Sequence, residues 1–206
     1  MTSKELYALL ARRYEAHANV SICSLHKPCS IHPQCGPKGS STKVMNFDEV
    51  MTAFQSAKGQ PAHPSVDAVC SASNSFCFVE IKGWQKFLEW TEGLTEEKIK
   101  EKVAEYDLAL KLSKSELLCC EVAGDDNLFN KLGESFILVT DIVVSDKDAV
   151  DSALQELNNN LLALAVTSNK WYSICNSSMQ EQLDKQISIS TYYVQCKGFD
   201  NLVARL

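Results

Sequence analysis

The sequence predicts an α/β domain with a mixed central sheet flanked by helices, and two observations carry this prediction. Two short strands rich in Val, Phe and Cys, at 66–71 and 76–81, are joined by a small polar turn, which is typical of a β-hairpin. Helical patterns alternate with further strands predicted at 135–144 and 187–196. Because a hairpin pairs antiparallel strands, part of the sheet must be antiparallel.

The first half of the chain shows its elements by apolar spacing. A stripe of Leu and Tyr predicts a helix over 3–18, with Ser3 as its N-cap. Residues 47–54 fit a short helix or a turn. After the hairpin, 84–90 and 95–122 carry apolar residues at helical spacing among many Lys and Glu, which predicts one broken helix or two consecutive ones.

The second half is dominated by one apolar run. Residues 135–144 give the strongest strand signal and are apolar enough for a central strand that is covered on both faces. Helical spacing over 145–166 predicts another helix, and a polar stretch over 167–185 leads to the strand at 187–196. A short tail follows.

Composition indicates one globular domain over residues 1–206. A chain of 206 residues with 45% hydrophobic and 22% charged side chains can bury one sizeable core. An uncharged apolar run of about 18 residues is absent, and Glu5 stands where a signal peptide would be apolar, so neither a membrane span nor secretion is expected. Nine cysteines, an odd number with two adjacent, favour reduced thiols in the cytoplasm over a disulfide framework.

Charge is unevenly distributed. The net charge of −6 argues against a wholly basic, nucleic-acid-coating surface. Residues 1–44 nevertheless carry a net +4. We expect phosphate groups to be met mainly there, or by a partner subunit. The basic side chains of this segment are Lys4, Arg12, Arg13, Lys27, Lys38 and Lys43.

The predicted hairpin carries the most informative side chains. Glu80 and Lys82 share one face of their strand, because strand side chains alternate with a period of two. If the turn sets the pairing, Asp67 lies opposite the end of the second strand, near Glu80. Two converging carboxylates suit Mg²⁺ or Mn²⁺, and Lys82 could orient a water or neutralise charge on a phosphate. This predicts a site that hydrolyses phosphodiesters.

The same residues resemble a known motif. The segment His63-Pro-Ser-Val-Asp67, followed by Phe78-Val-Glu80-Ile-Lys82-Gly-Trp84, resembles the PD-(D/E)XK nuclease superfamily. The resemblance implies a restriction-endonuclease-like core of a helix, three strands, a helix and a further strand. One departure is that the first acid follows Pro64 by three positions rather than directly.

The resemblance also implies residue roles. Asp67 and Glu80 would bind the metal, and Lys82 would assist the nucleophilic water. Members often add a glutamate from the first helix, and Glu5 is our candidate in preference to Glu15 because it lies nearer the edge of the apolar stripe.

The function implied is a Mg²⁺- or Mn²⁺-dependent nuclease, foremost a DNA endonuclease of restriction, repair or defence, with RNA also open as a substrate. The alternative is a catalytically inactive nuclease-like scaffold that acts as an interaction subunit for protein or nucleic acid. A partner subunit or a homodimer fits either interpretation, and a thiol enzyme is a third possibility.

An irregular segment at about 21–44 holds five candidate zinc ligands at a strict spacing of three. Thiolates and imidazoles at such gaps are usual ligands of structural Zn²⁺, and four of the five could close a tetrahedral site. The pattern lacks the usual two separated ligand pairs, so simple packing of cysteines and prolines is the favoured interpretation and zinc stays open. The five candidates are Cys23, His26, Cys29, His32 and Cys35.

Overall fold

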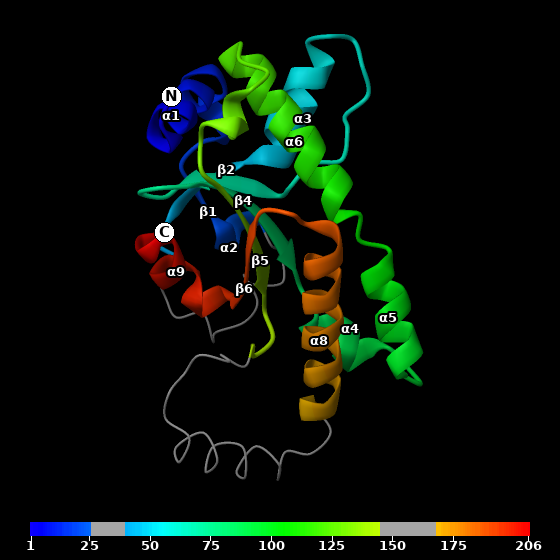
Figure 1. Ribbon diagram of the computed structural model, residues 1–206. Helices are drawn as coiled ribbons and strands as arrows, with labels where there is room; N and C mark the ends of the chain where they lie inside the picture. The colour runs from blue at the N-terminus through cyan, green and yellow to red at the C-terminus, as the bar shows by residue number, and fades with distance from the viewer. Residues whose placement is uncertain (26–39, 145–167) are drawn as a thin grey trace.

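A computed structural model describes residues 1–25, 40–144 and 168–206. In this part of the chain six strands form one mixed sheet, and their order in the sheet is their order in the sequence (Figure 1). The first four strands pair antiparallel, whereas the fourth, fifth and sixth run parallel. The strands are β1 (Val20–Ser21), β2 (Lys43–Asn46), β3 (Ala68–Ser71), β4 (Phe76–Lys82), β5 (Glu134–Thr140) and β6 (Ser190–Gln195).

Helices cover both faces of the sheet. The larger layer, α1, α3, α5, α6 and α8, buries its apolar side chains in one core cluster, and α2 and α9 pack on the opposite face. The α-helices are α1 (Ser3–Arg13), α2 (Ile22–Leu25), α3 (Phe47–Ser56), α4 (Gln85–Trp90), α5 (Glu96–Ala104), α6 (Leu108–Ala123), α8 (Ser168–Gln186) and α9 (Phe199–Arg205). Short 3₁₀ helices span Glu15–His17, Leu128–Asn130 and Cys196–Gly198. None of the described helices is long and apolar enough to cross a membrane.

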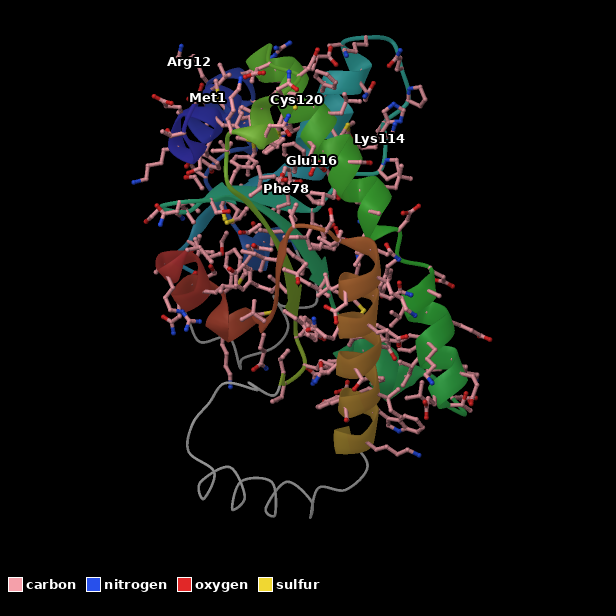
Figure 2. All side chains as sticks on the ribbon, in the orientation of Figure 1. Met1, Arg12, Phe78, Lys114, Glu116 and Cys120 are labelled. Carbon is pink, nitrogen blue, oxygen red and sulfur yellow. The ribbon has the colours of Figure 1, made fainter. Side chains whose placement is uncertain are left out.

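Alternation along β4 decides which side chains meet the larger helical layer. Phe76 and Phe78 belong to the core cluster under that layer, whereas Val79 and Ile81 belong to the cluster under α9. Figure 2 labels Phe78 on the sheet. Because alternate side chains share a face, Glu80 continues the row of the two phenylalanines toward the larger helical layer.

The predicted hairpin and its register are confirmed. Ala68 lies opposite Val79, and Ser71 lies opposite Phe76. The Ala72 amide closes the turn by donating to the Ser75 carbonyl at 2.9 Å.

The predicted central strand is also confirmed. Strand β5 lies between β4 and β6. Phe136 and Leu138 face the larger helical layer, while Ile137 and Val139 face the opposite layer.

The stretch predicted as one broken helix or two consecutive helices forms three, α4, α5 and α6, and local signals explain the additional break before α6. Asp107 caps α6 by accepting from the Leu110 amide at 3.1 Å, and the Gln186 side chain accepts from the Leu108 amide at 2.8 Å. The helix ends at Gly124, which adopts φ +68°, a left-handed conformation that favours glycine.

Two expectations about helices are wrong. The polar stretch at 167–185 is the 19-residue helix α8. Its buried stripe is narrow, with Cys175, Met179 and Leu183 spaced four apart, so polar residues dominate the sequence around it. The N-cap of α1 is Thr2 rather than Ser3.

Strands β1 and β2 and helices α2 and α9 are absent from the sequence-based prediction. The two strands extend the antiparallel edge of the sheet, α2 lies within the segment predicted to be irregular at about 21–44, and the predicted tail forms α9. The helix predicted over 145–166 lies outside the described residues.

The C-terminal helix is fastened to the start of β2 through Asp200. Its carboxylate accepts from the Ser40 hydroxyl at 2.5 Å and from the amides of Ser41 and Thr42 at 2.7 and 3.0 Å. Although burial opposes the charged form, these hydrogen bonds hold the pKa of Asp200 well below its ordinary value. The Ser21 hydroxyl donates to the Ser40 carbonyl at 3.1 Å, so β1 is joined to the same point.

Candidate functional site

The structure brings Asp67 and Glu80 to the open end of the β3–β4 hairpin. The residue pair next to them in register is Ala68 and Val79, so Asp67 continues the ladder opposite Glu80, as predicted. Asp67 Oδ2 accepts a hydrogen bond from the Ile81 amide at 2.6 Å. The carboxylate of Asp67 therefore accepts a hydrogen bond from a β4 amide just beyond the last residue pair of the ladder. This hydrogen bond fixes the carboxylate beside Glu80.

Glu80 is a fully buried carboxylate with an uneven environment. Its Oε1 contacts the ammonium groups of both Lys82 and Lys111, the latter at 2.6 Å. The other oxygen, Oε2, is buried and has no hydrogen-bond partner among the described residues. A buried charge is costly unless it is paired, and an unpartnered oxygen on it calls for a ligand.

Lys82 is held in place by an aromatic ring. Its Nζ lies 4.8 Å from the centroid of the Tyr106 ring, a cation–π contact. The Tyr106 ring packs edge-on against Trp84, with 6.2 Å between their centroids. Burial and the nearby Glu80 raise the pKa of the Tyr106 hydroxyl, so it stays protonated.

Asp48 joins the cluster and was not predicted. It lies in the first turn of α3, where the helix dipole favours an anion. The Ser65 hydroxyl donates to Asp48 Oδ1 at 2.6 Å, and the carboxylate interacts electrostatically with Lys111. Asp48 itself is exposed, so it stands at the rim of the cluster.

Lys111 also was not predicted, although the sequence carries a signal for it. The buried stripe of α6 runs through Leu108, Leu112 and Ser115, and Lys111 interrupts this stripe with a charge. The buried hydroxyl of Ser115 is satisfied by two hydrogen bonds. It donates to the Lys111 carbonyl at 2.7 Å and accepts from the Val66 amide at 3.1 Å. A lysine and a serine on the buried side of a helix are the pattern that could have revealed this contact.

Burial and neighbouring charges shift the pKa values of the cluster residues. Burial raises the pKa of Asp67, although Lys82 and Lys111 oppose the rise. Burial also raises the pKa of Glu80, and the charge of Asp67 adds to the rise. For Lys82 burial alone would lower the pKa, but Glu80 and Asp67 raise it above the ordinary value. Groups with perturbed pKa values that gather in this way are typical of functional sites.

Glu5 does not join this cluster. Its carboxylate accepts from the Thr2 amide at 2.7 Å and completes the capping box of α1. The neighbouring Ser3 hydroxyl donates to the Ala72 carbonyl at the hairpin turn, so this end of α1 lies at the opposite end of β4 from Glu80. The assignment of Glu5 to the catalytic group therefore conflicts with the geometry.

The candidate zinc segment is described only at Cys23. This thiol accepts from the Ser40 amide at 3.4 Å, and it is half-buried. The other four candidates, His26, Cys29, His32 and Cys35, lie outside the described residues. The zinc hypothesis is therefore neither confirmed nor contradicted.

The carboxylate oxygens of the cluster are the type of ligand that a hard divalent cation prefers. Oxygen ligands from one or two carboxylates, completed by water and substrate phosphate, are how Mg²⁺ is usually held. Asp67 and Glu80 supply such a pair, and Glu80 Oε2 is the oxygen that lacks a partner. Over the described ranges, no group of three or more His, Cys, Asp or Glu is arranged to hold a metal.

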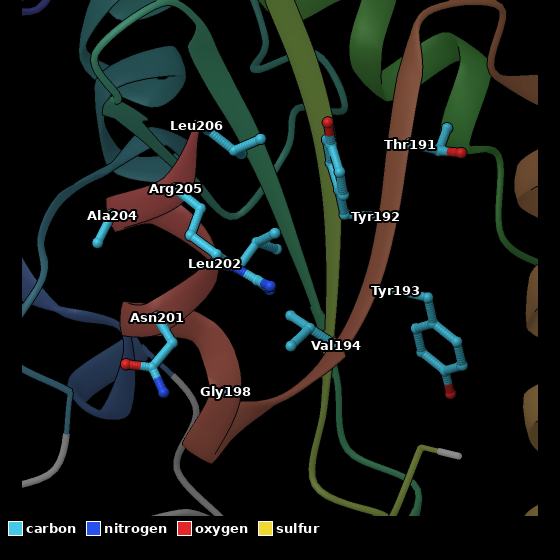
Figure 3. A pocket seen from close by; sticks show the side chains of 10 residues that line it. All are labelled: Thr191, Tyr192, Tyr193, Val194, Gly198, Asn201, Leu202, Ala204, Arg205 and Leu206. Carbon is cyan, nitrogen blue, oxygen red and sulfur yellow. The ribbon is translucent and has the colours of Figure 1, made fainter. Parts of the chain in front are cut away.

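A separate hollow lies beside β6 and α9 (Figure 3). Its volume is about 1030 Å³, and Tyr192, Asn201 and Arg205 are among its lining residues. The lining residues come from 191–206, and none of the cluster residues is among them. This hollow is therefore distinct from the candidate site.

Comparisons with known protein families, with curated proteins and with solved structures found no match to this chain.

A second pair of carboxyl groups lies away from the cluster. Glu134 begins β5 opposite Phe76, and its side chain hydrogen-bonds to that of Glu116 on α6, which Figure 2 labels. Burial, with the charge of Glu116, raises the pKa of Glu134 to about 8. The two groups therefore share a proton at neutral pH.

This pair predicts a pH-dependent stability. Because the pKa of Glu134 in the folded state exceeds its ordinary value of 4.5, the contribution of this group to the stability of the fold is complete below pH 4.5 and is lost as the pH rises through about 8. Replacing Glu134 by Gln keeps a hydrogen-bond donor to Glu116 and removes this ionisation. We expect Glu134→Gln to match the wild type at pH 5 and to be more stable by about 1–2 kcal/mol at pH 9, a value reduced for partial solvent screening.

Urea unfolding at both pH values measures this difference. The matched control is Glu101→Gln on α5, where the glutamate is exposed. Equal stability changes for the two variants at pH 9 would contradict the role assigned to the pair.

Proposed function

We propose that this chain is a nuclease that hydrolyses phosphodiester bonds with Mg²⁺ or Mn²⁺. The observation that carries the proposal is a fully buried Glu80 with Asp67 opposite and Lys82 two residues further along the same strand face. Burying three charged groups together costs free energy, and most surface Glu–Lys pairs avoid that cost by staying exposed. The arrangement is therefore better explained by chemistry than by stability.

The chain's own residues have separable tasks in this reaction. Asp67 and Glu80 would hold the cation, with Asp67 oriented by the Ile81 amide. A bound Mg²⁺ supplies a water of lowered pKa and stabilises charge on the phosphate under attack. Lys82, fixed between Glu80 and the Tyr106 ring, is placed to stabilise the same developing charge or to orient the water.

The order of elements supports the restriction-endonuclease-like core that the resemblance implies. Helix α1 precedes the antiparallel strands β2, β3 and β4, and after further helices β5 adds in parallel beside β4. The acids and the lysine then fall where β3 begins and β4 ends, at one end of the hairpin.

Only some of the basic residues predicted to meet phosphate can be placed relative to this site, since Lys27 and Lys38 lie outside the described residues. Arg12 and Lys4 lie on α1, whose N-terminus packs at the far end of the hairpin, and Figure 2 labels Arg12 there. Lys82 and Lys111 are the cations within the cluster. We propose DNA as the substrate, with a partner subunit or a second copy of the chain adding positive surface.

One observation favours a second candidate function, a catalytically inactive nuclease-like scaffold. Two lysines contact the same oxygen of Glu80, so the carboxylate is already neutralised by the protein. In a scaffold of this kind, the ion cluster would hold the hairpin to α6, and the protein would act through its surfaces.

Incubation of the purified protein with supercoiled plasmid tests the first proposal. We expect nicked and linear DNA in the presence of Mg²⁺ or Mn²⁺ and none with EDTA, because the carboxylates act through the cation. Single-stranded DNA and RNA are assayed in parallel to define the substrate.

The matched control is Glu80→Gln, which keeps the shape of the side chain and removes its charge. We expect it to lose cleavage while retaining the fold in circular dichroism. Cutting that persists in EDTA or in Glu80→Gln contradicts the proposed site, and silence on all three substrates favours the scaffold.

A further inference from the structure

The two lysines of the cluster are bound unequally. Both lysines contact Glu80 and interact with Asp67, but Lys82 also stacks on the Tyr106 ring, and 17% of its side chain is exposed. Lys111 reaches Glu80 Oε1 at 2.6 Å from the neighbouring helix, and 24% of its side chain is exposed. Lys111 is therefore the ammonium that can leave the cluster with least disturbance.

The position of Lys111 on α6 also indicates that its ammonium can leave the cluster easily. It is the fourth residue of the helix, near an N-terminus whose partial positive charge disfavours a cation. The attraction of Glu80 and of the nearby Asp48 is what holds it there. A long flexible stem lets its ammonium move to solvent without any change in the helix.

The charge balance of the cluster changes sign with a divalent cation. In their ionised forms, Asp48, Asp67 and Glu80 with the two lysines carry one net negative charge, which a divalent cation would turn into one net positive charge. Withdrawal of one lysine would make the cation-bound cluster neutral. Because like charges a few ångströms apart repel strongly in a half-buried site, binding of the cation and departure of an ammonium are coupled.

We propose that Lys111 is a resident counterion that neutralises Glu80 in the metal-free protein and leaves Glu80 Oε1 when a divalent cation binds. This inference rests on the proposed function, in which Asp67 and Glu80 hold the cation. Lys111 thereby sets the metal affinity of the site, and it lowers that affinity because every binding event must first break the ion pair with Glu80.

Binding of Mn²⁺ in the absence of nucleic acid tests the inference, with free Mn²⁺ followed by electron paramagnetic resonance. The Lys111→Met variant keeps the apolar stem and removes the charge. We expect it to bind Mn²⁺ roughly tenfold more tightly than the wild type, because one charge-assisted contact no longer has to be broken. Lys111→Arg, which keeps the charge, should bind as the wild type does.

Two controls separate a local effect from general ones. Lys114→Met removes the same charge one turn further along α6, and it should leave the Mn²⁺ affinity unchanged. Adding Glu80→Gln to Lys111→Met should abolish the gain, which assigns it to this site. Circular dichroism confirms the fold, and Lys111→Gln gives the same comparison if the methionine variant does not fold.

The outcomes distinguish this inference from the proposed function. Equal or weaker Mn²⁺ binding by Lys111→Met, with clear binding by the wild type, overturns the inference and leaves the nuclease proposal standing. No Mn²⁺ at the site in any variant overturns both. Binding that begins only when Lys111 is replaced supports the inference and favours the inactive scaffold, because the wild-type lysine then excludes the metal.

Discussion

Replacing Lys82 by methionine is expected to lower the rate of metal-dependent cleavage roughly 10²–10⁴-fold, the range that one positioned proton-transfer or charge-stabilising group contributes. The ammonium is fixed by Glu80 and by the Tyr106 ring, so it is preorganised for charge that develops on the phosphate. Methionine keeps the contact with the ring and removes the charge. Lys111 still compensates Glu80, so the fold should persist.

Single-turnover cleavage of plasmid and Mn²⁺ titration together measure this effect. We expect the cleavage rate to fall while Mn²⁺ still binds, since Asp67 and Glu80 remain. The matched control is Lys102→Met on α5, where the lysine pairs with Glu105 at the surface. A Lys82→Met variant that cleaves at the wild-type rate would remove the lysine from the mechanism.

Replacing Phe78 by alanine is expected to destabilise the protein by about 3–5 kcal/mol, the usual cost of truncating a buried phenylalanine. The side chain is fully buried, and its ring packs at 5.4 Å from the Phe76 centroid and 5.5 Å from that of Phe129. Strand β4 is paired on both edges, so the backbone cannot collapse into the cavity.

Urea denaturation followed by circular dichroism gives this loss directly. Leu117→Ala is the control, because Leu117 lies on α6 with 57% of its surface exposed and should cost below about 0.5 kcal/mol. If the two variants lose similar stability, the core under α6 is packed differently from the structure.

The hairpin could be predicted because its signals are local. A small polar turn between two apolar runs sets the register, and the register sets which side chains share a face. The approach of Asp67 to Glu80 follows from that register alone, so this half of the site was predictable from the sequence.

The rest of the fold depends on contacts between distant segments. Strands β1 and β2 have two and four residues, and such short strands form only because a neighbouring strand offers an edge, β2 for β1 and β3 for β2. Helix α8 buries a stripe one residue wide, which periodicity does not separate from a polar loop.

The other half of the site, Asp48 and Lys111, lies on helices and was not predicted from the sequence. Asp48 stands in the first turn of α3, where acids are common in any helix. Lys111 is 31 residues from Glu80 in the chain, within a segment rich in lysine and glutamate. The pairing of Lys111 with Ser115 on the buried side of α6 is the one signal in the sequence for this contact. Glu5 lies outside the site because a local cap satisfies its carboxylate and its helix end packs at the hairpin turn.

The hydrogen bonds of Asp200 attach the C-terminal helix α9 to residues 40–42, at the start of β2. Ser21 and Cys23 contact Ser40 on one side, and Asp200 grips residues 40–42 on the other. The described residues on either side of 26–39 are thus held to each other and to α9. The side chain of Asp200 therefore joins the end of the chain to the antiparallel edge of the sheet across 160 residues of sequence.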